Sequence, residues 1–219
     1  KLNEAGHAVI ATKLKQSGST ELDHTASKAI CDTTDRLNAL HHIDKRDGDD
    51  EREWTADFAM LLAPSFVSLH RAVGLHSATD YWLKGGRGST KSSAVSLEIV
   101  RLLMADESRN AVVMRKVART LRMSVYAQMK WAIATLGLND EFDATVSPME
   151  ITRKSTRQKV AFLGVDEPEK VKSYKPEKGY VAVHWYEETD QFSGMEEIRN
   201  VSQSLTRGGN DFWRFFSFN

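Results

Sequence analysis

The stretch that most constrains this chain is a loop of eight residues at positions 85–92, Gly-Gly-Arg-Gly-Ser-Thr-Lys-Ser. Aromatic and aliphatic residues at 81–84 precede it, and an apolar-rich stretch at 92–104 follows it. The first pattern is typical of a short strand and the second of a helix that is buried on much of its circumference. A glycine-rich loop in this setting turns backbone N–H groups inward, where they and the positive end of the helix can hold a phosphate. The loop therefore predicts a phosphate-binding site of the P-loop type.

The loop residues have expected parts in nucleotide binding. Lys91 would reach the outer phosphates and the Ser92 hydroxyl would ligate magnesium, so ATP and Mg²⁺ are the expected cofactors. Arg87 either contacts a terminal phosphate or the catalytic carboxylate, or simply faces solvent. Thr90 stands where the usual pattern has glycine; because that position needs a permissive backbone, threonine could distort the loop or slow turnover. The predicted nucleotide-binding residues are Gly85, Gly86, Arg87, Gly88, Ser89, Thr90, Lys91 and Ser92. The alternative is a glycine-rich turn that binds nothing.

A pair of carboxylates follows a second apolar stretch, which is predicted to be a strand over 180–185. A P-loop enzyme needs one carboxylate to organise the metal and usually another to orient the attacking water. Glu187 would help to hold magnesium, in place of the more usual aspartate, and Glu188 would polarise the water. A pair of surface glutamates is the alternative. His184 is interpreted as a packed strand residue, because no second histidine or cysteine lies near it in the sequence.

The rest of the chain alternates between strand and helix patterns. Residues 1–46 read as helical, and the acidic stretch 47–53 reads as a linker or exposed loop. Strands are predicted at 111–114, 150–152, 159–164 and 212–218, and helices at 118–136 and 195–205. This alternation predicts an α/β fold with a mainly parallel central sheet flanked by helices. A hairpin-like insertion around 150–163 would make the sheet mixed.

Composition restricts the classes of function. Lys+Arg and Asp+Glu are both 30, so the formal net charge is zero. This balance argues against a permanently basic nucleic-acid coat, although it leaves room for a local basic face. No apolar run approaches the roughly 18 residues that span a bilayer, so no membrane partner is expected.

Together these segments resemble one family. The similarity lies in residues 63–70, 81–93, 113–117, 162–173, 185–188 and 215–219, and covers about 58–219. In these stretches the chain resembles phage terminase large subunits, with the prophage-type branch closest. That branch tolerates both the threonine at 90 and the glutamate at 187. The resemblance implies a RecA-like (ASCE) P-loop ATPase domain over 58–219, preceded by a helical extension with its acidic linker over 1–57. It also implies that the family's C-terminal nuclease domain is absent from this chain.

The family packages viral genomes, so the resemblance implies a function. ATP hydrolysis would power translocation of double-stranded DNA into a procapsid. The expected partners are double-stranded DNA, the portal protein, the small terminase subunit and further copies of the chain in a homo-oligomeric ring; a monomer in isolation stays open. The expected location is the host cytoplasm, with transient docking at the procapsid portal.

The resemblance also assigns residues. Lys91, Arg87 and Glu188 are the expected catalytic residues, and Ser217 and Asn219 match the motif that couples hydrolysis to movement. The candidates for an arginine finger or a DNA contact are Arg115, Lys116, Arg119, Arg122 and, more weakly, Arg207. A solvated helix face is the alternative for this basic run.

Two other functions remain open. One is a different nucleic-acid-dependent P-loop ATPase of the helicase type, which would unwind strands where a packaging motor moves duplex DNA intact. The other is a nucleotide-binding module that does not turn over. Glu188 argues against the second, since a protein that only binds nucleotide does not need a residue to activate water.

Overall fold

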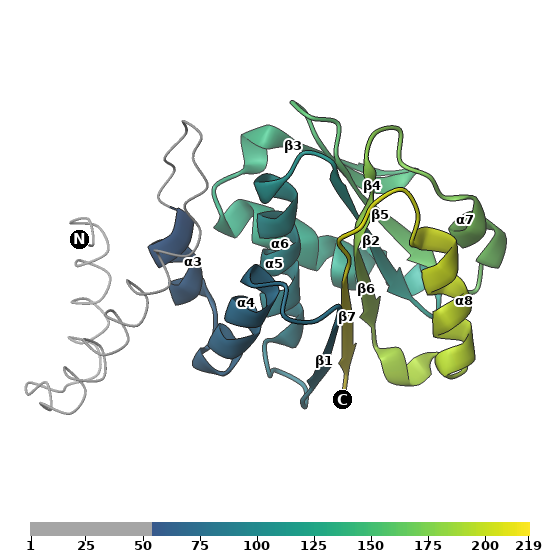
Figure 1. Cartoon of the computed structure of the whole chain (residues 1–219), viewed down its shortest axis with the longest axis horizontal. Helices are drawn as coiled ribbons and strands as arrows, with labels where there is room; N and C mark the ends of the chain where they lie inside the picture. The colour runs from purple at the N-terminus through teal and green to yellow at the C-terminus, as the bar shows by residue number, and fades with distance from the viewer. Residues whose placement is uncertain (1–53) are drawn as a thin grey trace, which may run out of the picture. The chain divides into compact units, whose positions relative to one another are not determined.

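A computed structural model describes residues 54–219 of the chain (Figure 1). The helical extension and acidic linker predicted over 1–57 lie outside the described residues, apart from the last four positions. The predicted boundary near residue 57 therefore stays a prediction. Within 54–219, no helix is long and apolar enough to cross a membrane.

A mixed seven-stranded sheet forms the centre of the described part. Its strands are β1 (Asp80–Lys84), β2 (Arg109–Arg115), β3 (Phe142–Val146), β4 (Met149–Arg153), β5 (Lys159–Gly164), β6 (Tyr180–Glu187) and β7 (Trp213–Phe218). They follow the order β1-β7-β6-β2-β5-β4-β3. The pairs from β1 to β5 are parallel, whereas β5–β4 and β4–β3 are antiparallel. The predicted α/β class, with a mainly parallel but mixed sheet, is confirmed.

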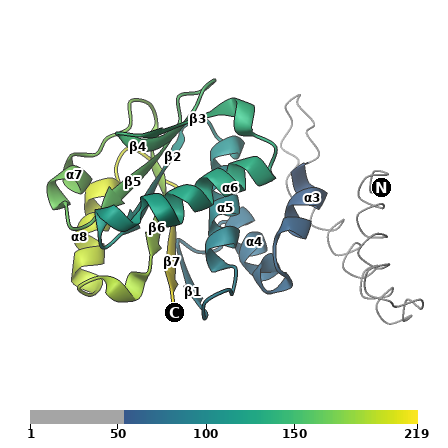
Figure 2. The same ribbon diagram turned by 180° about the vertical axis from the view of Figure 1, so that it is seen from behind.

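Helices cover both faces of this sheet (Figures 1 and 2). The covering helices are α4 (Val67–Gly74), α5 (Lys91–Ala105), α6 (Ala127–Thr135), α7 (Pro168–Ser173) and α8 (Met195–Leu205), and α3 (Trp54–Leu61) precedes them in the chain. The figures place α4, α5 and α6 on one face and α7 and α8 on the other. Buried side chains of α8, including Ile198 and Val201, pack in one cluster with Met114 of β2 and Tyr186 of β6. Burial on both faces explains why β2 and β6 read as near-continuous apolar runs.

One predicted helix is not continuous. The sequence predicts a helix over 118–136, but the structure has a 3₁₀ turn (Ala118–Thr120), a π-helical segment (Arg122–Tyr126) and only then α6. Side chains compete for the carbonyl that a regular helix would use: the Ser124 hydroxyl donates to Thr120 O at 2.6 Å. The Tyr126 amide accordingly reaches Leu121 O at 3.0 Å, which is the five-residue spacing of a π turn.

Other differences are smaller. β3 is not among the predicted strands, although Phe142, Ala144 and Val146 alternate with polar residues; of its five residues only Phe142 is buried. β6 continues past the predicted end at 185, so Glu187 is its last residue. Helices α4 and α7 are short, and no helix is predicted for their residues.

The topology brings several strand ends together. β1, β7, β6 and β2 are adjacent and parallel, so all four end at the same edge of the sheet. Open α/β sheets bind ligands at this edge. The P-loop, the two carboxylates and the end of the chain all follow these strands, which positions the site described next.

Candidate nucleotide-binding site

The phosphate loop connects β1 directly to α5, as the sequence predicts. Gly85 packs closely against Ser89, since a Cβ there would lie 3.0 Å from Ser89 Oγ, and Gly88 has a φ of +77°, which favours glycine. Thr90 has φ 59° and ψ 15°, the left-handed conformation that glycine would adopt. The expected distortion does not appear, since the Ala94 amide bonds to Thr90 O at 3.0 Å and starts the helix regularly.

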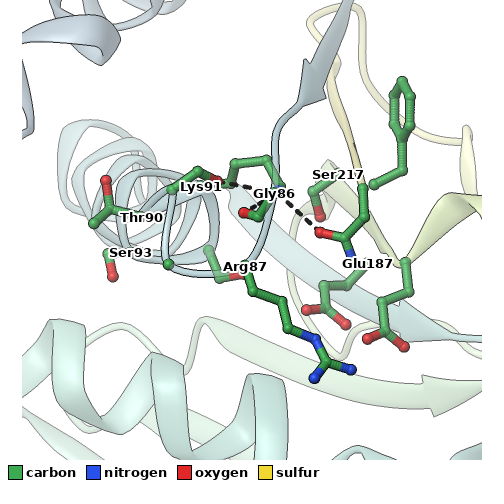
Figure 3. Close-up of a pocket in the computed structure, with 13 residues that line it drawn as sticks. Gly86, Arg87, Thr90, Lys91, Ser93, Glu187 and Ser217 are labelled. Atoms are coloured by element: carbon green, nitrogen blue, oxygen red, sulfur yellow. Dashed lines mark hydrogen bonds between the residues drawn. The ribbon is translucent and has the colours of Figure 1, made fainter.

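Lys91 turns back into its own loop (Figure 3). Its ammonium donates to Gly85 O, to Gly86 O at 3.3 Å and to Ser89 Oγ at 3.1 Å. It also donates to Asn219 Oδ1 at 3.3 Å, at the other end of the sequence. The residue is 8% exposed, so a buried cation lies at the floor of the loop. An arriving phosphate would offer it a stronger, charged acceptor.

The two carboxylates lie at the end of β6 and face this loop. Burial raises the pKa of the Glu187 carboxyl, and nearby Arg115 and Ser92 offset part of that rise. Glu188 has φ 55° and ψ 55°, so a residue with a side chain again takes the left-handed conformation. Strain of this kind gathers at functional sites, where the surrounding structure holds it.

Arg115 lies between these carboxylates. Its Nε approaches Glu187 Oε2 at 2.8 Å without the alignment of a hydrogen bond, and a terminal nitrogen pairs with Glu188. The same guanidinium donates to Ser124 Oγ at 3.1 Å in the π-helical segment. Arg115 is thus the last, buried residue of β2, inside the site of its own chain. This placement favours a role within the same subunit over the predicted roles of finger or DNA contact.

The predicted coupling residues reach the same place. Ser217 is 2% exposed and its Oγ accepts a hydrogen bond of 2.9 Å from Trp185 Nε1. Phe218 O accepts the Gly85 amide at 3.2 Å, which joins the end of β7 to the start of the loop. The contact between Asn219 and Lys91 then brings the end of the chain onto the phosphate loop.

A cavity of about 350 Å³ unites these groups. It is lined by Gly86, Arg87, Gly88, Ser89, Thr90, Lys91, Ser92, Ser93, Glu187, Glu188, Ser217, Phe218 and Asn219. Sequence reasoning missed Ser93 and Phe218, although each directly follows or precedes a predicted site residue. Of the predicted loop residues only Gly85 is not in the lining; it lies just below, against Ser89.

Arg87 lines the cavity, whereas the remaining candidates for a finger or a DNA contact are not among its lining residues. Arg87 is exposed and extends away from the loop (Figure 3). Lys116 is engaged by Glu197 at 2.5 Å, whereas Arg119 and Arg122 are exposed. Arg207 precedes β7, so it lies toward the opposite edge of the sheet.

Two neighbouring groups suit a magnesium ion. Ser92 lies in the first turn of α5, and both Ser92 and Glu187 line the cavity. Glu187 Oε2 is buried and accepts no hydrogen bond within the described residues. A hydroxyl and a carboxylate oxygen are the hard ligands that magnesium prefers, so the donor set fits the ion.

Comparison with known proteins gives a consistent set of similarities. Residues 79–219 match the family model described as phage terminase large subunit. The chain is 34% identical over 160 residues to the terminase large subunit of Bacillus phage SPP1, covering 71% of this chain and 38% of that protein. It is also 34% identical over 122 residues to the PBSX phage terminase large subunit of Bacillus subtilis strain 168, covering 55% and 27% respectively. The chain therefore spans well under half the length of these relatives.

A solved structure shows the same fold. The ATPase domain of the large terminase from Thermus phage P74-26 superposes with a TM-score of 0.55 at 13% identity. The match covers 79% of this chain and 70% of that one.

Proposed function

The chain belongs to the phage terminase large subunit family, and we propose that it hydrolyses ATP to drive double-stranded DNA into a procapsid. One observation carries the enzymatic part of this proposal. Lys91, Glu188 and Asn219 come from three separate segments, and they line one cavity at the carboxyl edge of the sheet. A glycine-rich turn with a purely structural role does not require a buried cation, an amide and a carboxylate on a strained backbone around one cavity.

The P-loop binds the triphosphate of ATP in this proposal. Backbone N–H groups of the loop and the positive end of α5 face the phosphates, and Lys91 exchanges its carbonyl partners for phosphate oxygens. Arg87 is exposed at the rim, where its guanidinium can meet a terminal phosphate. Ser92 and Glu187 would hold Mg²⁺, which would neutralise charge on the phosphates.

Glu188 activates the attacking water. It orients the water and accepts its proton while the water oxygen forms a bond to the γ-phosphorus. The bond between that phosphorus and the β–γ bridging oxygen breaks, which yields ADP and inorganic phosphate. Arg115 pairs with Glu188, so the guanidinium and the attacking water compete for this carboxylate. Ser217 and Asn219 respond to hydrolysis of the γ-phosphate, since Asn219 accepts a hydrogen bond from Lys91, which binds the phosphates.

The wider assembly belongs to the same proposal. The chain would act in a homo-oligomeric ring with the portal protein, the small terminase subunit and DNA, docked at the procapsid in the host cytoplasm. Arg119 and Arg122 are the exposed basic residues that could enter a neighbour's site or contact DNA phosphates. A site completed between subunits would turn over slowly in a monomer.

The test is steady-state phosphate release from Mg²⁺–ATP over a range of protein concentrations. Glu188→Gln should keep ATP binding and lose hydrolysis, because the amide cannot accept the proton. Lys91→Ala should weaken both. Glu196→Gln provides the matched control, since Glu196 is an exposed carboxylate in the first turn of α8.

Each result has a clear meaning. Glu188-dependent release that rises more than linearly with concentration supports a motor completed between subunits. ATP binding without release at any concentration supports a binding module instead. Undiminished release by Glu188→Gln removes the assignment of the water-activating residue. Separation of DNA strands by an active chain would favour the helicase-type alternative.

A further inference from the structure

The turn that follows Glu188 has one side chain that links it to two strands. Glu188 is held with φ 55°, a conformation that is unfavourable for a residue with a Cβ atom. Two backbone hydrogen bonds close the turn, from Gln191 N to Glu188 O at 2.9 Å and from Phe192 N to Thr189 O at 3.2 Å. These bonds close the turn on itself but do not tie it to the rest of the sheet.

Besides the ion pair of Glu188 with Arg115 of β2, Thr189 connects the turn to the sheet. Its hydroxyl donates to Tyr186 O in β6 at 2.9 Å and lies 3.4 Å from Ser217 O in β7. A hydroxyl has one hydrogen, so it can serve only one of these carbonyls fully at a time. The shorter contact is with β6, and the β7 carbonyl is the available second acceptor.

The second acceptor lies at a sensitive point of the site. Ser217 pairs with Glu187 in the register of β6 and β7, and its side chain is fixed by Trp185. Two residues further on, Asn219 contacts Lys91 on the phosphate loop. A movement of Asn219 caused by phosphate binding would therefore displace the carbonyl that faces the Thr189 hydroxyl.

We propose that Thr189 is a positioning residue that ties the Glu188 turn to the end of β7. Its hydroxyl holds Glu188 in the left-handed conformation and shifts between the carbonyls of Tyr186 and Ser217 as the end of β7 moves. This inference rests on the proposed function and deepens it. Thr189 does not touch the reacting atoms; it sets where Glu188 stands.

The test compares Thr189→Val with Thr189→Ser in the 219-residue chain. Valine keeps the branched shape and removes the hydroxyl, whereas serine keeps the hydroxyl. Thr189→Val should lower kcat about ten- to a hundredfold, the range expected when a reacting group is misplaced. Its affinity for ATP, measured by equilibrium binding of a fluorescent ATP analogue, should stay within about twofold, because the P-loop is untouched. Thr189→Ser should restore most of kcat.

Thr206→Val is the matched control. The Thr206 hydroxyl also donates to a backbone carbonyl, Ser202 O at 2.7 Å, but at the far end of α8. It should leave kcat unchanged. Circular dichroism and melting temperature establish that each variant is folded; if valine prevents folding, Thr189→Ala takes its place with the same expected split.

The outcomes separate this inference from the proposed function. A wild-type chain without Glu188-dependent hydrolysis refutes the proposed function, and the inference fails with it. An active wild type with normal kcat in Thr189→Val refutes the inference alone. A fall in kcat that serine does not rescue, or that accompanies an equal loss of ATP affinity and a lower melting temperature, shows a merely structural role and also overturns it.

Discussion

Replacement of Thr90 by glycine should make the protein more stable, although it touches no packed core. Thr90 has φ 59° and ψ 15°, and its carbonyl starts α5 through Ala94. A residue with a Cβ in this region costs roughly 1–2 kcal/mol, and a β-branched residue lies toward the upper end. Glycine removes that cost but gives the unfolded chain more freedom, which offsets about 0.4–1 kcal/mol. The net gain should be about 0.5–1 kcal/mol, which is a rise in Tm of about 2–3 °C for a protein of this size.

The assay is differential scanning calorimetry without nucleotide, with Thr90→Ala as the control. Alanine keeps the Cβ atom and most of the unfavourable conformation, so it should gain much less than glycine. ATP affinity should change little in Thr90→Gly, because the loop N–H groups keep their directions. A Tm for Thr90→Gly at or below that of the wild type would refute the reasoning. So would an equal gain for Thr90→Ala, since the left-handed backbone would then not be the cause.

Two further predictions concern pH. Burial lowers the pKa of His184 from 6.5 to about 4. The folded protein therefore loses stability as the pH falls from 6.5 toward 4, because the unfolded chain binds the proton more readily. His184→Gln should remove about 2 kcal/mol of that loss at pH 5, measured as the free energy of unfolding in urea at pH 7 and pH 5. If the free energy of unfolding falls as much between pH 7 and pH 5 in His184→Gln as in the wild type, the prediction is wrong. Burial raises the pKa of Glu187, so its charged form costs stability at pH values above the ordinary pKa of a glutamate. Glu187→Gln should therefore raise Tm by a few degrees at pH 8, and by less as the pH is lowered toward that ordinary pKa. A lower Tm at pH 8 would show that the ion pair with Arg115 outweighs the cost of burial.

Local signals carried most of what could be predicted about the site. The strand, loop and helix around Lys91 are contiguous, so each residue's part follows from its neighbours in the sequence. Glu187 is the last residue of an apolar strand and Glu188 follows it, so both lie at the predicted strand end. His184 is fully buried in β6, as interpreted from the absence of a partner nearby in the sequence. The predicted roles of these residues in catalysis are left to the experiments above.

Features that depend on contacts between distant segments could not be predicted from the sequence. The helix predicted over 118–136 is interrupted because the side chains of Arg115 and Ser124 donate hydrogen bonds to the Thr120 carbonyl. Arg115 belongs to strand β2, so this contact is not visible in the helical segment itself. The same guanidinium reaches Glu187 and Glu188, some seventy residues along the sequence. Position in a basic run had suggested a finger or a DNA contact for Arg115. Only the pairing of β2 with β6 shows that it faces its own carboxylates.

The sequence by itself determined the class of fold, the phosphate loop and the carboxylates, because each depends on residues that are neighbours along the chain. The tertiary structure decided which groups meet: it placed β7 between β1 and β6, and so brought Asn219 to Lys91 and the Ser217 carbonyl to Thr189. The order of strands in a parallel sheet depends on how crossover helices pack on its faces, and that packing is settled by the whole core at once. The strand order therefore cannot be read from any short stretch of sequence.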